Sequence, residues 1–162
     1  MAGKQDILKS ITNKSIAPPD EVVERKRVKP ARGPEAAKAY AIACARLMHD
    51  QKCEEIVVLD LRGVSPICDF FVIANGTSER QMRAVVDHTK KMGKECGEAP
   101  YSVSGYDESK WIVVDYVDVI IHLFDGEHRA YYDLDSLWGD GEVIDWESGL
   151  PAQDRRPSGT EG

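Results

Sequence analysis

The chain has 162 residues, a length that suits one domain with extensions, because domains usually hold about 100–200 residues. Hydrophobic residues make up 42% of the chain, which is enough for a packed core and excludes a wholly disordered protein. No apolar run approaches the roughly 20 residues needed to span a bilayer, and the N-terminus lacks a basic start followed by an apolar stretch. We therefore expect a cytoplasmic protein with no membrane partner.

Charge is distributed unevenly along the chain. Residues 1–34 hold eight Lys and Arg against four Asp and Glu, whereas residues 35–149 hold 11 against 22. A folded part this acidic repels nucleic-acid phosphate, so its charge favours a basic protein as partner.

Composition also predicts the domain organisation. The first 33 residues are basic and contain several prolines, which indicates a flexible N-terminal extension suited to nonspecific RNA contact. An organelle-targeting peptide is the alternative for this segment, and its acidic residues disfavour it. We expect one α/β domain over residues 34–146 and a flexible tail over residues 147–162.

Four cysteines occupy positions 44, 53, 68 and 96, too far apart in sequence for a Cys-x-x-Cys motif. No pair of histidines completes a zinc-binding set. We interpret the cysteines as free, largely buried thiols and expect neither a metal nor a cofactor.

The first half of the domain shows a helix and two strands. Gly33-Pro34-Glu35 opens a helix to about residue 51, because proline fits the first turn and an acid favours the positive end. Apolar residues recur along it at helical spacing. The short runs at residues 55–60 and 69–74 are apolar and β-branched, which is typical of buried strands.

A second helix begins at Ser78, where Ser-Glu-Arg-Gln has the form of a capping box. Met82, Val85, Val86 and Thr89 define its apolar face, together with Gly93 and Cys96, and Gly97 ends it. A strand at residues 101–104 follows, so strand–helix–strand predicts a parallel crossover.

The runs at residues 111–115 and 118–124 are so close that only a tight hairpin can join them, with its tip at Tyr116-Val117. Alternation places Trp111 and Val113 on one face and Ile112 and Val114 on the other. A last helix is expected from about residue 127 to residue 138. The order α-β-β-α-β-β-β-α predicts an α/β fold with a mixed sheet and helices mainly on one face.

Several stretches together resemble a known family. They are Leu-Asp-Leu-Arg-Gly at 59–63, Asp-Phe-Phe-Val-Ile-Ala at 69–74, Gly-Thr-Ser-Glu-Arg-Gln at 76–81, Trp-Ile-Val-Val-Asp-Tyr at 111–116, Asp-Val-Ile-Ile-His at 118–122, and Arg129 with Tyr132, Leu134, Asp135, Leu137 and Trp138. In order and spacing they resemble the ribosomal silencing factor (Iojap-like) family over about half of the chain. The long terminal extensions depart from its compact members.

The resemblance implies a nucleotidyltransferase-like fold without enzymatic activity. It implies a factor that binds ribosomal protein L-fourteen on the large ribosomal subunit and sterically blocks the small subunit, which represses translation. The basic N-terminal tail would add nonspecific rRNA contact.

The hairpin is the predicted docking surface, because an exposed patch with Trp111, Val113 and Ile120 would mark an interface, and Asp115 and Asp118 would meet Lys or Arg. The complete set of predicted partner-binding residues is Trp111, Val113, Asp115, Tyr116, Asp118, Ile120, His122, Tyr131, Leu134 and Trp138. The alternative is that Trp111 and Ile120 fill the core. The stripe of Tyr131, Leu134 and Trp138 either packs on the sheet, extends the docking surface or pairs two copies in a homodimer.

Two other functions are alternatives. A nucleotidyltransferase fits the Gly76-Thr77-Ser78 turn but also needs paired carboxylates on a strand, and the Asp133-Leu134-Asp135 motif falls on an expected helix. An RNA-binding module would use the basic tail. The sequence offers no catalytic partner for His122, so a structural or contact role is favoured over catalysis.

Overall fold

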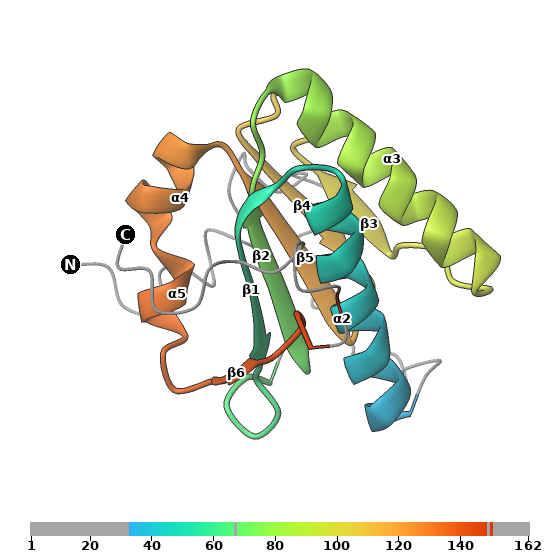
Figure 1. Ribbon diagram of the computed structural model, residues 1–162. Helices are drawn as coiled ribbons and strands as arrows, with labels where there is room; N and C mark the ends of the chain where they lie inside the picture. The colour runs from blue at the N-terminus through green and yellow to red at the C-terminus, as the bar shows by residue number, and fades with distance from the viewer. Residues whose placement is uncertain (1–32, 67, 149, 151–162) are drawn as a thin grey trace.

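Six strands form a single mixed sheet in the order β3-β4-β5-β2-β1-β6 (Figure 1). The computed structural model describes residues 33–66, 68–148 and 150. The strands are β1 (Glu54–Asp60), β2 (Phe70–Asn75), β3 (Ser102–Ser104), β4 (Trp111–Asp115), β5 (Val119–Phe124) and β6 (Glu142–Ile144). β2 and β5 are parallel and the other neighbouring strands are antiparallel, which confirms the predicted mixed sheet.

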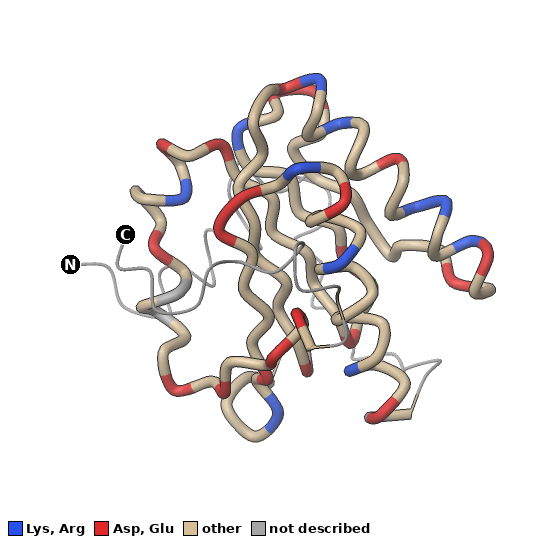
Figure 2. The backbone as a smooth tube through the Cα atoms, in the orientation of Figure 1, with Lys and Arg blue, Asp and Glu red and all other residues tan. Residues whose placement is uncertain are grey.

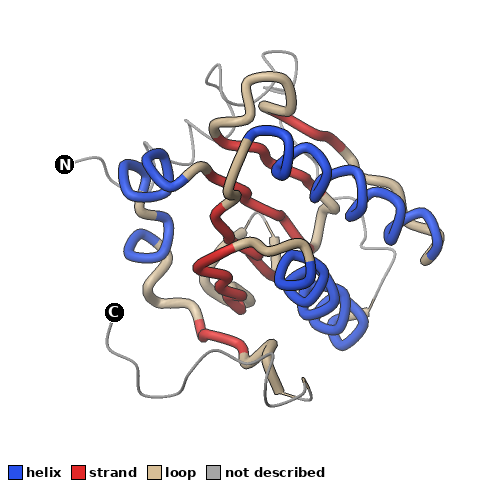
Figure 3. The backbone as a smooth tube through the Cα atoms, turned by 45° about the horizontal axis from the view of Figure 1, so that its top comes forward, coloured by secondary structure: helices blue, strands red, loops and turns tan. Residues whose placement is uncertain are grey.

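Helices cover both faces of the sheet to different extents. The two long helices, α2 (Pro34–Asp50) and α3 (Glu79–Glu95), lie together on one face, as predicted (Figure 3). The short helices α4 (Gly126–Tyr132) and α5 (Leu134–Leu137) lie across the other face. No helix in the described part of the chain is long and apolar enough to cross a membrane.

The long helices form for the reasons that the sequence indicates. α2 begins at Pro34 behind Gly33, with Glu35 in its first turn. α3 begins behind Ser78, whose side chain accepts a hydrogen bond from the Gln81 backbone N–H at 3.0 Å. The Gln81 side chain reaches back to the backbone N–H of Thr77 and also donates to the Gln51 carbonyl, so this cap joins the two helices.

Between these helices and the sheet lies a largely aliphatic core. Its buried members include Ala41, Met48, Val58, Val85 and Ile121. The chain enters α3 from β2 and leaves it for β3, which runs parallel to β2 with β4 and β5 between them. The predicted parallel crossover is confirmed.

The predicted hairpin is also present, with β4 and β5 antiparallel and Asp115 opposite Ile120. Its tip is a three-residue turn in which the Asp118 N–H donates to the Tyr116 carbonyl at 3.0 Å. Val117 at the centre has a φ of 77°, a conformation that is strained for a β-branched residue. The Asp115 side chain accepts the Val117 N–H at 2.7 Å and holds this turn.

Two expectations for the end of the domain are wrong. The last helix is interrupted at Asp133, which has a left-handed φ of 46° and separates α4 from α5. The segment after Trp138 was expected to contain no further element, but it forms β6, which pairs with β1. Trp146 beyond β6 is buried and donates from its ring N–H to the Ile56 carbonyl at 3.2 Å.

Three of the four cysteines are buried, and Cys96 is exposed, because α3 ends before its expected apolar face reaches that position. All four are free thiols, as predicted. The expected N-terminal extension and most of the expected C-terminal tail lie outside the described residues.

Candidate docking surface

The hairpin residues alternate between the two faces of the sheet as predicted, but neither face is exposed. Ile112 and Val114 join the aliphatic core under α2 and α3. Trp111, Val113 and Ile120 are buried on the opposite face, in a second core with residues of α5 and the segment after it. The expectation of an exposed apolar patch on the hairpin is therefore wrong, because α4 and α5 cover the face where it lies.

The second core is a cluster of aromatic rings around Trp111. The Trp111 ring stacks on Phe124 with centroids 4.9 Å apart and contacts Tyr132 of α4 at 4.4 Å. Phe71 of β2 meets the Trp138 ring edge-on at 5.7 Å. Aromatic pairs at these separations are attractive beyond the area that they bury, so they fix the short helices on the sheet.

His122 lies inside this cluster. Its side chain is fully buried, and its Nδ1 accepts a hydrogen bond from the Trp111 ring N–H at 3.1 Å. Because Nδ1 accepts, the ring proton of neutral His122 is on Nε2, which has no hydrogen-bond partner in the described structure. The imidazole ring meets the Phe71 ring edge-on, with centroids 4.4 Å apart. Burial lowers the pKa of His122 to about 3, so the ring is neutral at physiological pH. His122 thus has a structural contact in the fold.

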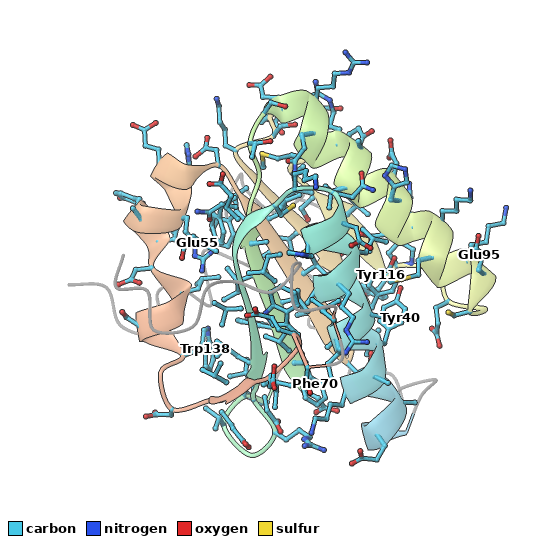
Figure 4. The ribbon with its side chains drawn as sticks, viewed as in Figure 1. Tyr40, Glu55, Phe70, Glu95, Tyr116 and Trp138 are labelled. Carbon is cyan, nitrogen blue, oxygen red and sulfur yellow. The ribbon has the colours of Figure 1, made fainter. Side chains whose placement is uncertain are left out.

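The carboxylates expected to steer a partner are also buried. Asp115 holds the hairpin turn, and Asp118 is 1% exposed, with its backbone carbonyl accepting from the N–H groups of Asp69 and Phe70. Tyr116 packs on the other face of the sheet, where it meets the Tyr40 ring of α2 edge-on at 5.2 Å (Figure 4). The structure therefore does not bring Tyr116 together with Trp111.

α4 has a side-chain cap at its start and polar contacts with two strands of the sheet. Asp125 caps its start by accepting the His128 backbone N–H at 2.8 Å. Arg129 donates to the Glu55 carbonyl at 2.9 Å and to the Asn75 side chain at 3.0 Å, which ties the helix to β1 and β2. α4 has no buried residue of its own, so these polar contacts and Tyr132 hold it in place.

Acidic residues predominate along the chain from α4 through α5 to β6, on one side of the molecule (Figures 1 and 2). Tyr131 on α4 is 80% exposed and Val143 on β6 is 69% exposed. The exposed acidic residues around them include Glu127, Asp133, Asp140 and Glu142. These six residues define what we name the α4–β6 surface.

Of the ten predicted docking residues, only Tyr131 is exposed. Leu134 and Trp138 of the same predicted stripe are buried in the second core, because the break at Asp133 turns α5 toward the sheet. Sequence reasoning missed Val143 and the acidic residues beside β6. The β-branched pair Val143-Ile144 after Gly141, followed by the polar–apolar step Asp145-Trp146, was the signal for this short strand.

The Asp133-Leu134-Asp135 motif does not supply the paired carboxylates on a strand that a nucleotidyltransferase needs. Asp133 lies at the break between α4 and α5 and not on a strand. Among the described residues, no group of three His, Cys, Asp or Glu side chains lies close enough to hold a metal ion.

The structure defines an α/β domain in which helices cover both faces of the sheet. The outer surface of this domain is acidic and partly aromatic. The family model described as "Ribosomal silencing factor during starvation" (RsfS) matches residues 34–161. The chain belongs to this family, and its predicted family resemblance is confirmed.

Individual relatives agree with this assignment. The chain is 40% identical over 98 residues to the ribosomal silencing factor RsfS of Halalkalibacterium halodurans, covering 60% of this chain and 84% of that protein. It is 36% identical over 113 residues to RsfS of Bacillus subtilis, covering 70% and 92%. A mouse relative named "Mitochondrial assembly of ribosomal large subunit protein 1" is 35% identical over 95 residues, which cover 57% of this chain and 42% of that protein.

Solved structures share the fold. A Chromobacterium violaceum protein matches 67% of this chain and 88% of its own, with a TM-score of 0.60 and 28% identity. A Bacillus halodurans protein matches 68% of this chain and 97% of its own, with a TM-score of 0.57 and 33% identity.

Proposed function

We propose that this protein binds the large ribosomal subunit at ribosomal protein L-fourteen and sterically prevents the small subunit from joining. Family membership supports the ribosomal target. The mechanism is occlusion, in which no bond is made or broken and no cofactor takes part. A cytoplasmic location and a homodimer remain predictions, and the family includes relatives named as mitochondrial.

The observation that carries this proposal is the α4–β6 surface. Tyrosine often contributes much of the binding energy at an interface, and a tyrosine that is 80% exposed is available for contact. The surrounding carboxylates suit a partner rich in Lys and Arg, as ribosomal proteins are, and they favour fast and correctly oriented association. The buried side chains that would support this surface from the interior of the domain are Trp111, His122, Leu134 and Trp138.

Sedimentation with purified large subunits tests the apolar part of the surface. Tyr131→Ala is expected to weaken binding by about tenfold or more, because it removes an exposed interface anchor. Tyr101→Ala is the matched control, since Tyr101 is also exposed, at 48%, but lies beside β3. It should bind and block subunit joining like the wild type. Equal binding by both variants would exclude Tyr131 from the interface, and a wild type that stays in the supernatant would refute the function.

A charge-reversal pair tests the acidic part. Asp140→Lys with Glu142→Lys is expected to slow association and weaken binding, because it places like charges opposite a basic partner. Asp107→Lys with Glu108→Lys changes the net charge equally at exposed positions before β4 and should have little effect. If the two double variants bind equally, net charge and not the α4–β6 surface determines the affinity.

A further inference from the structure

Helix α3 differs in charge from the rest of the folded protein. It carries five Lys and Arg against three Asp and Glu, a net charge of +2. The other residues from 33 to 150 carry six Lys and Arg against 19 Asp and Glu, a net charge of −13. The acidic average of the domain therefore conceals one basic element.

Four of these cations form a stripe on the outer side of the helix. Arg80, Lys90, Lys91 and Lys94 are all exposed, and we name them the α3 basic stripe. At about 100° per residue they point away from the buried face, which includes Met82, Val85 and Thr89. The stripe extends for about 21 Å at a rise of about 1.5 Å per residue.

The stripe cations have no partner within the described structure, in contrast to most other basic residues. None of the four forms an ion pair or a hydrogen bond there. Elsewhere, Arg62 pairs with Asp60 at 2.7 Å, and Arg46 donates to the Trp146 carbonyl at 3.1 Å. Asp87, the acid within the stripe, is already engaged, because both of its oxygens lie 3.1 Å from the Tyr106 hydroxyl.

The basic stripe and the acidic surface lie on opposite sides of the domain. Figure 2 shows basic residues interspersed with fewer acidic ones along α3, and mainly acidic residues along the chain from α4 to β6. In Figure 4, Glu95 at the end of α3 and Trp138 after α5 mark these two sides.

We propose that the α3 basic stripe contacts the phosphate backbone of rRNA in the large subunit while the α4–β6 surface contacts a basic ribosomal protein. This inference rests on the proposed function and adds a second partner class to it. Exposed, unpaired Lys and Arg side chains bind phosphates and release the counterions condensed there. The acidic remainder repels phosphate, so rRNA contact by the described domain is confined to α3.

Salt dependence tests the contact in the full-length protein. Lys90→Gln with Lys94→Gln is expected to weaken binding to large subunits several-fold at low salt. It should also reduce the slope of log K against log salt by up to about two, because each lost phosphate contact contributes about one. The control, Lys52→Gln with Lys110→Gln, removes the same charge outside α3 and should leave the slope unchanged. Equal slopes for the two double variants would overturn the inference.

The exposed thiol at the end of α3 allows a direct test of what lies beside the stripe. Cys44, Cys53 and Cys68 are buried, so an iron chelate with a thiol-reactive group should attach to Cys96. Hydroxyl radicals from the bound, labelled protein should cleave rRNA strands next to α3, and Cys96→Ser should abolish the cleavage. Intact rRNA in sedimented, labelled complexes would overturn the inference while leaving the proposed function in place. A wild type that does not sediment would refute both.

Discussion

The two faces of the sheet are covered by different means. On one face, two 17-residue helices bury an aliphatic core, and each shows its apolar side over several turns. On the other, helices of seven and four residues are held by aromatic rings and by Arg129. The first face depends on periodic local sequence, whereas the second depends on single contacts between distant segments. Substitutions on the second face should therefore alter the α4–β6 surface as well as stability.

The largest expected effect is on the second core. Trp111→Ala removes the central ring of that cluster and should lower the free energy of unfolding by about 3–5 kcal/mol. Trp111→Phe keeps most of the ring volume but leaves His122 Nδ1 without its donor, at a cost of about 1–3 kcal/mol. Urea unfolding at pH 7 measures both values. A loss below about 1 kcal/mol for Trp111→Ala would show that the aromatic face adds little to the fold.

The second prediction concerns stability in acid, which depends on a buried residue of the second face. His122 has its pKa lowered to about 3 in the folded state, against about 6.5 when unfolded. Below pH 6.5 the unfolded chain binds a proton that the folded chain cannot, so stability falls by up to about 1.4 kcal/mol per pH unit. His122→Phe should unfold with a weaker pH dependence between pH 6.5 and 4.5. Parallel stability curves for the wild type and the variant would contradict the burial of a neutral ring.

The smallest expected effect is local. Arg129→Ala removes the contacts with Glu55 and Asn75 and should cost about 1–2 kcal/mol. Because α4 has no buried residue, hydrogen exchange should accelerate in residues 126–137 more than in α2 or α3. Arg80→Ala, at an exposed position without a partner, is the control. Uniform acceleration across the domain would show that α4 and α5 unfold only with the whole protein.

The sequence was sufficient for elements whose signals are local. The apolar spacing of α2, the cap at Ser78 and the alternation of the hairpin each predicted what the structure contains. The motifs that resemble the silencing factors also led to the correct family. Such signals are readable because backbone periodicity and capping act within a few residues.

Only the tertiary structure showed that neither face of the hairpin strands is exposed to solvent. Both faces of β4 and β5 are apolar, so alternation separated Trp111 from Ile112 without showing that each is covered. The left-handed Asp133 turns α5 onto the sheet, and β6 adds an edge strand in a segment where no further element was expected. The charge of α3 was likewise hidden in a domain average. Exposure depends on which distant segments pack together, and local sequence patterns do not encode that choice.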